Sequence, residues 1–213
     1  MKFYLLVLLS MSLINKSAWS RPVSYPTGLT TILNNNGSQN SALIHYSPTA
    51  KYSLGLRREY RRNEKYSLTS LQMNNLLRRW NKRDSQANFY LKSGLGYAET
   101  NSNHNSDDSS LAFFTGFSVD WETRRLFTMY ENRFIGAGGV DDRFMQFARL
   151  GVAPYIADFG QLHTWLMLEL DHEPKGKNDF TITPLVRLFK DVHLVEFGLS
   201  NHQDVVFNWT VRF

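Results

Sequence analysis

The sequence predicts an all-β fold, a single-domain antiparallel transmembrane β-barrel of about 12 strands. Apolar and polar residues alternate with a period of two along most of the chain. No segment after residue 20 is apolar enough for a spanning helix. Short connections also alternate with longer ones that are rich in Asn, Asp, Gly and Ser. Together, these three observations favour strands that cross a membrane.

Residues 1–20 (MKFYLLVLLSMSLINKSAWS) have the organisation of a secretory signal peptide. Lys2 supplies the positive start and an apolar run follows, with the small residues Ala18 and Ser20 at the predicted cleavage site. A retained anchor helix is disfavoured because the run is shorter than the ~20 residues that a bilayer requires. We therefore expect a secreted barrel domain over 21–213.

Strand-like alternation recurs from residue 28 to the end of the chain. The last segment is the clearest example, because its two faces separate completely. If the two short segments at the start do not span, ten or eight strands would remain. The predicted segments are 28–34, 41–47, 52–61, 66–80, 87–98, 110–122, 124–134, 143–155, 160–171, 179–189, 191–200 and 204–213.

The connections indicate which membrane is crossed. PTAK (48–51) and IADF (156–159) are short, whereas NNNGSQN (34–40) and GAGGVDD (136–142) are longer and polar. Short turns on one rim and longer loops on the other are typical of outer-membrane barrels. A soluble β-sandwich or a lipocalin-like barrel would also alternate and is the alternative fold. We expect the cell outer membrane.

The chain ends on Phe213, in an alternating strand that must close the barrel against the first strand. An aromatic end on such a strand resembles the outer-membrane signature that the barrel-insertion machinery recognises. The residues expected to face lipid and to carry this assembly signal are Phe207, Trp209, Val211 and Phe213.

Composition excludes several classes of site. The chain has no cysteine, which rules out disulfides, thiolate metal sites and cysteine nucleophiles. Its net charge is +5 and its basic residues are spread along the chain, so nucleic acid is not an expected partner. We expect no cofactor, and we expect outer-membrane lipids and lipopolysaccharide as partners.

Charged residues of both signs fall on the face opposite the lipid-facing one. They could line a small passive channel, or they could pair across strands and largely fill a structural barrel. The sequence leaves both interpretations open. The residues expected to line the lumen are Arg57, Lys92, Asp120, Arg125, Glu131, Arg133, Arg149, Glu169, Arg187, Glu196 and Arg212.

A lipid-acting enzyme is an alternative function. His45 and Ser47 lie two residues apart on one strand face, as in outer-membrane phospholipase and lipid A deacylase, where His deprotonates Ser. Here Ser47 abuts a short turn, at the opposite end from the outer leaflet where those enzymes work. We therefore expect no enzymatic activity.

A soft-metal site is a second alternative. Met129, Met145 and Met167 fall on the inward face of three consecutive segments, and thioethers suit Cu(I) or Ag(I). Methionine also fills irregular gaps in packed interiors. Strand stagger would then keep the three sulfurs apart.

Four basic residues gather at the predicted outer end of the third and fourth segments. Arginine forks bind phosphate well, and lipopolysaccharide phosphates lie at that depth. The predicted lipopolysaccharide contacts are Arg58, Arg61, Arg62 and Lys65.

Several stretches, including HYSPTAKYSLGLRREY, GVAPYIADFGQLHTWLMLELDH and DVVFNWTVRF, resemble an uncharacterised family of proteobacterial outer-membrane β-barrel proteins. The resemblance covers most of the mature chain. It implies an outer-membrane barrel whose gene often lies beside heavy-metal efflux systems. It supplies no catalytic residues.

Overall fold

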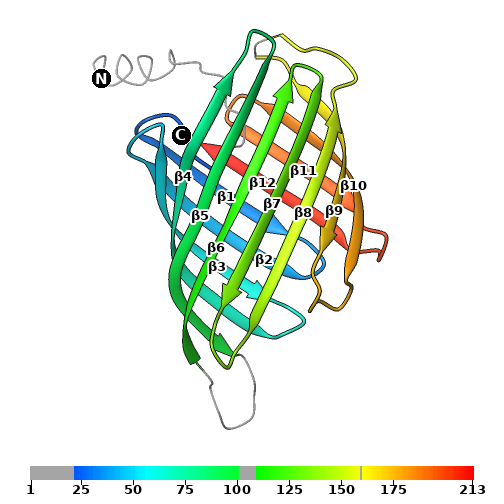
Figure 1. Ribbon diagram of the computed structural model, residues 1–213. Coiled ribbons are helices and arrows are strands. Elements are labelled where there is room, and N and C mark those ends of the chain that lie inside the picture. The colour runs from blue at the N-terminus through cyan, green and yellow to red at the C-terminus, as the bar shows by residue number, and fades with distance from the viewer. Residues whose placement is uncertain (1–21, 101–108, 159) are drawn as a thin grey trace, which may run out of the picture.

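The computed structural model describes residues 22–100, 109–158 and 160–213, so the predicted signal peptide lies outside the described residues. Twelve antiparallel strands close into one barrel (Figure 1). No helix that could span a membrane occurs within these ranges. The strands are β1 Gly28–Asn35, β2 Gln39–Ser47, β3 Tyr52–Arg61, β4 Tyr66–Asn81, β5 Ser85–Thr100, β6 Ser109–Thr123, β7 Leu126–Gly136, β8 Asp142–Val152, β9 His163–His172, β10 Phe180–Lys190, β11 His193–Leu199 and β12 Val205–Arg212.

The first and last strands close the barrel. β1 pairs with β12 from Thr30 opposite Arg212 to Asn35 opposite Phe207. Beyond that ladder, the Phe213 N–H donates to the Leu29 carbonyl (2.8 Å), and the Leu29 N–H donates back to Phe213 (3.0 Å). The 12-stranded prediction is confirmed, because the two short early segments are full members of the sheet.

The two ends of the barrel differ in their connections. The end that carries the carboxyl terminus, upper in Figure 1, is here called the turn end, and the opposite end the loop end. Most turn-end connections are two to four residues long, but the one between β8 and β9 covers 153–162 and is longer than predicted. β8 stops at Val152, just before Pro154, which has no N–H to continue the ladder.

The outer surface of the barrel is apolar and the inside is polar. Large apolar side chains such as Leu56, Leu95, Leu111 and Leu150 are exposed on the exterior, whereas many charged side chains are buried in the interior. A closed barrel satisfies every backbone group within the sheet and can present this surface to hydrocarbon. The chain is thus an outer-membrane barrel, as predicted.

Two apolar clusters occupy part of the interior. The loop-end cluster is centred on Tyr66, Phe114 and Ile135, with Met145 packed against it. The turn-end cluster includes Phe127 and Trp165, whose ring centroids lie 6.3 Å apart. These side chains fill space on the β4–β10 side and leave the rest of the lumen to polar groups.

Candidate functional site

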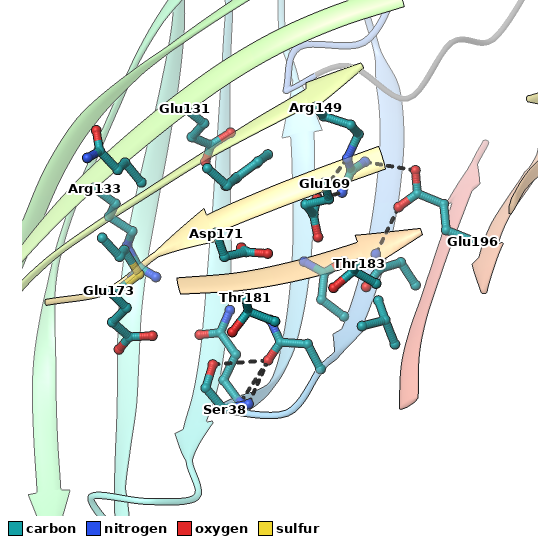
Figure 2. Close-up of a pocket in the computed structure, with 18 of the residues that line it drawn as sticks. Ser38, Glu131, Arg133, Arg149, Glu169, Asp171, Glu173, Thr181, Thr183 and Glu196 are labelled. Atoms are coloured by element: carbon teal, nitrogen blue, oxygen red, sulfur yellow. Dashed lines mark hydrogen bonds and ion pairs between the residues drawn. The ribbon is translucent and has the colours of Figure 1, made fainter. Parts of the chain in front are cut away.

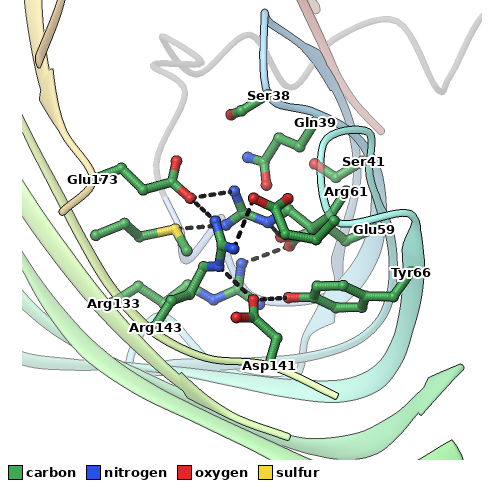
Figure 3. A network of polar contacts seen from close by, with 12 residues as sticks. Ser38, Gln39, Ser41, Glu59, Arg61, Tyr66, Arg133, Asp141, Arg143 and Glu173 are labelled. Atoms are coloured by element: carbon green, nitrogen blue, oxygen red, sulfur yellow. Dashed lines mark hydrogen bonds and ion pairs between the residues drawn. The ribbon is translucent and has the colours of Figure 1, made fainter. Parts of the chain in front are cut away.

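A network of ion pairs crosses the lumen near the loop end (Figure 3). The fully buried Glu59 carboxylate on β3 accepts hydrogen bonds from Arg57 Nε (3.0 Å) and Arg133 Nη1 (2.6 Å). It also forms an ion pair with Arg61, whose Nε lies 2.8 Å from Glu59 Oε1. Arg133 lies on β7, four strands away, so the Arg133–Glu59 pair passes through the interior rather than along the wall.

The network continues to the far wall. Arg61 also reaches Glu173 Oε1 (3.1 Å), just beyond β9, and its Nη2 lies 2.9 Å from Met145 Sδ. Arg143 bridges Glu64 (2.8 Å), Asp141 and Glu173. Because β3 and β9 are half a circumference apart, these groups form a bar across the barrel. We call them the crossbar: Arg57, Glu59, Arg61, Glu64, Arg133, Asp141, Arg143 and Glu173.

A second network runs along one wall and does not cross the lumen (Figure 2). Arg149 on β8 pairs with Glu169 on β9 and with Glu196 Oε1 on β11 (2.9 Å). Arg187 Nε donates to the same Glu196 oxygen (2.6 Å), and Asn208 Nδ2 donates to Glu196 Oε2 (2.8 Å). We call this group the wall network. Between β5 and β7, Lys92 pairs with Glu131 (2.5 Å).

A cavity of about 390 Å³ remains between these networks. At the loop end it is lined by neutral groups such as Asn36 and Asn178 together with charged ones such as Glu173 and Lys177, and farther in by the wall network. Near the turn end it reaches Leu194, Thr210 and Pro22. Residues of all twelve strands border the open space, which extends over most of the barrel length.

The segment just before β1 folds into the turn end of the lumen. The Pro22 carbonyl accepts from Ser53 Oγ (2.8 Å) and Asn74 Nδ2 (3.2 Å), and the Ser24 N–H donates to Ser47 Oγ (3.0 Å). Val23 between them is buried. Because Pro22 lines the cavity, this segment narrows its turn end. The alternation pattern gives no signal for it, since the segment precedes the first strand.

Most residues predicted to line the lumen do line this cavity. They are Arg57, Lys92, Asp120, Glu131, Arg133, Arg149, Glu169, Arg187 and Glu196. Arg212 is buried on the inner side of β12 but is not part of the cavity wall. The prediction for Arg125 is wrong: β7 begins one residue later, and Arg125 lies exposed in the turn with Nη2 donating to the Pro154 carbonyl (3.2 Å).

Two predictions for the exterior also need correction. Phe207, Trp209 and Phe213 are exposed, but Val211 is only 4% exposed although its alternation is outward. Arg61, predicted to contact lipopolysaccharide, is 1% exposed. It shares the inward face of β3 with Glu59, and its guanidinium is held in the crossbar.

The other three residues of that basic group lie outside the lumen. Arg58 is exposed and donates to Thr69 Oγ1 (3.1 Å). Arg62 donates to the Asn35 side chain (3.3 Å) and the Gln39 carbonyl (3.1 Å), and Lys65 is exposed.

The three methionines do not converge. Met145 packs in the loop-end cluster, whereas Met129 and Met167 belong to the turn-end cluster. The Met145 sulfur contacts Arg61 in the crossbar. Within the described ranges, no group of three or more His, Cys, Asp or Glu could hold a metal ion. The residues do not fit the soft-metal alternative.

The arrangement around His45 and Ser47 lacks the contacts of a nucleophilic pair. Neither ring nitrogen of His45 has a hydrogen-bond partner among the described residues, and Ser47 Oγ accepts from the Ser24 backbone. A nucleophilic serine requires a base within hydrogen-bond reach and a third group that orients the base. The geometry gives the lipid-enzyme alternative no support.

Sequence reasoning missed four members of the crossbar. Arg143 shares its strand face with Arg149, so alternation could have found it. Glu64, Asp141 and Glu173 lie in connections, where alternation carries no information about direction.

The fold resembles that of known outer-membrane barrels. Two structures of the KdgM porin, one in complex with disordered oligogalacturonate, match with a TM-score of 0.51 and 11% identity over 87% of this chain and 98% of the porin. The translocator domain of autotransporter NalP from Neisseria meningitidis matches with a TM-score of 0.46 and 8% identity, over 100% of this chain and 93% of the domain. No family model and no curated protein sequence matches the chain. At these identities the likeness shows the fold alone, that of a 12-stranded outer-membrane barrel.

Proposed function

We propose that this protein is a small passive channel for hydrophilic solutes across the outer membrane. The observation that carries the proposal is the cavity of about 390 Å³, whose wall includes residues from both ends of the barrel. The alternative is a filled structural barrel. The crossbar favours that alternative near the loop end, but the cavity that extends along the barrel favours a narrow path.

The wall of the path suits water and small polar molecules. Asn36, Asn178, Thr181, Thr183 and Asn208 supply amide and hydroxyl groups along the β1 and β9–β12 side. Such groups replace hydration without binding a solute tightly. The porin fold of the KdgM structures is consistent with this proposal, although the sequence identity is too low to transfer a substrate.

Conductance of the refolded protein in planar bilayers tests the proposal, with two tryptophan variants on adjacent residues of β10. Thr181 lines the cavity and Ile182 faces outward. We expect small unitary steps in the wild type, their loss in Thr181→Trp, and their persistence in Ile182→Trp. A heat-dependent shift on SDS gels checks that each variant is folded. A folded wild type without conductance would favour the filled barrel.

We also propose that Arg58, Arg62 and Lys65 contact lipopolysaccharide phosphates. All three lie at the loop end, outside the lumen, and Arg58 and Lys65 are exposed there. An arginine that faces lipid is tolerated near the interface, where phosphate is within reach. During assembly, the exposed aromatic end at Phe213 is the proposed contact for the barrel-insertion machinery.

A further inference from the structure

We infer that the path prefers cations over anions and that Asp171 sets this preference. The inference rests on the proposed channel and adds a class of solute to it. Asp171 lies on β9 and lines the cavity beside Thr181, its cross-strand neighbour (Figure 2).

The basic groups of the wall are already engaged in ion pairs. Every Lys and Arg that lines the cavity from a described strand has a carboxylate within salt-bridge distance. The pairs are Arg57–Glu59, Arg61–Glu59, Lys92–Glu131, Arg133–Glu59, Arg149–Glu196 and Arg187–Glu196. A passing anion would have to compete with these carboxylates for each guanidinium, at the cost of breaking a buried pair.

Asp171 differs from the other acids of its strand. Glu169 is held by Arg149, and Glu173, which follows β9, is held by Arg61 and Arg143. Among the described residues, no hydrogen bond or salt bridge engages the Asp171 carboxylate, and its side chain is partly exposed to the cavity. When it is ionised, it offers a negative charge and free oxygen acceptors directly to the path.

The neighbouring part of the cavity wall also suits a cation. Thr181 and Thr183 on β10 face the same cavity with hydroxyl groups, which suit a partly hydrated cation. The remaining lining lysine, Lys177, sits exposed in the β9–β10 connection, where water screens its charge. The expected permeants are small inorganic cations and small amines.

The experiment is a reversal-potential measurement across a KCl gradient, with two variants that each remove one negative charge. Asp171→Asn acts on the cavity wall, and Asp179→Asn acts on an exposed residue of the same hairpin that does not line the cavity. We expect a cation-selective wild type. A unit charge about 4 Å from a permeant in water corresponds to a factor of roughly five, so Asp171→Asn should lower the potassium-to-chloride permeability ratio by that factor. Asp179→Asn should leave the ratio within experimental error.

The outcomes separate the two proposals. An anion-selective or unselective wild type that conducts would overturn this inference and leave the channel intact. An equal effect of both substitutions, or none for Asp171→Asn, would show that Asp171 does not set the selectivity. A folded wild type that does not conduct would overturn both the channel and its selectivity.

Discussion

Two sides of the lumen carry the same kind of buried Arg–Glu pairs but arrange them differently. On the β3–β8 side, Glu59, Arg61 and Arg133 pair across the interior, over an apolar cluster that fills the space beneath them. On the β8–β11 side, Arg149 pairs with Glu169 on the adjacent strand and with Glu196 three strands away, and the cavity borders all three residues. Whether paired charges fill a barrel or line a path depends on whether the partners lie across from one another or side by side.

The largest expected effect is in the crossbar. Glu59→Gln leaves three guanidinium groups around a neutral amide in a buried site. Losing one partner of a buried ion network costs about 3–5 kcal/mol, so the variant should unfold at a clearly lower urea concentration. Unfolding in detergent, followed by the heat-dependent gel shift, measures this.

Glu99→Gln is the matched control, because Glu99 is exposed on the exterior near the same end. The urea concentration at the midpoint of its unfolding should equal that of the wild type. Equal midpoints for Glu59→Gln and Glu99→Gln would mean that the crossbar contributes nothing to stability.

A substitution in the wall network should destabilise the protein less than one in the crossbar. Arg149→Gln removes pairs to Glu169 and Glu196, but both carboxylates border the cavity and can be rehydrated. We expect a loss of about 1.5–3 kcal/mol, the range for hydrogen bonds to charged groups. The same urea titration, with the exposed Arg124→Gln as control, measures the loss. A loss larger than that of Glu59→Gln would reverse the comparison between the two sides.

A smaller effect is expected at the turn end, where Pro22 is held by two side chains. Asn74→Ala removes one of the two hydrogen bonds to the Pro22 carbonyl, worth about 1 kcal/mol, while Ser53 still donates. It also removes the Asn74 hydrogen bonds with Ser53 Oγ (2.9 Å) and Gln72 Nε2 (2.7 Å). Because the chain has no cysteine, Ser24→Cys is a clean reporter in this background. Its thiol should react severalfold faster with a water-soluble maleimide when Asn74 is replaced. An unchanged rate would indicate that Asn74 does not hold the segment in the lumen.

The smallest effect concerns the exterior. Arg58→Gln removes an exposed charge whose one hydrogen bond within the described chain goes to Thr69, so the free energy of unfolding should change by less than about 1 kcal/mol. Lipopolysaccharide that copurifies with the barrel should nevertheless decrease. Arg83→Gln, at the other end of the barrel, should retain it. Identical lipopolysaccharide content in both variants would argue against a contact at Arg58.

The sequence predicts the sheet and the faces of its strands because a membrane barrel imposes a strict two-residue period. The same period is enough to place Glu59, Arg133 and Arg149 on the inward face. It cannot show which of them meet, since Arg133 and Glu59 are 74 residues apart and their contact depends on the stagger of four strands. One error arises where the period stops, at Arg125 in a turn. Another concerns Arg61, whose own alternation is inward although the basic residues near it in the sequence lie on the outer surface.

The crossbar also constrains the order in which the molecule assembles. Its Arg61–Glu173 contact joins residues 112 positions apart, and no single hairpin contains both partners. Contacts of such sequence separation form only after the intervening chain has been ordered, which makes them late and slow to acquire. In a barrel whose hairpins have paired but whose strands β1 and β12 have not yet joined, these buried charges would lack their ion-pair partners. The crossbar therefore stabilises the closed barrel, and its ion pairs would form at the last step of folding, together with the pairing of β1 with β12.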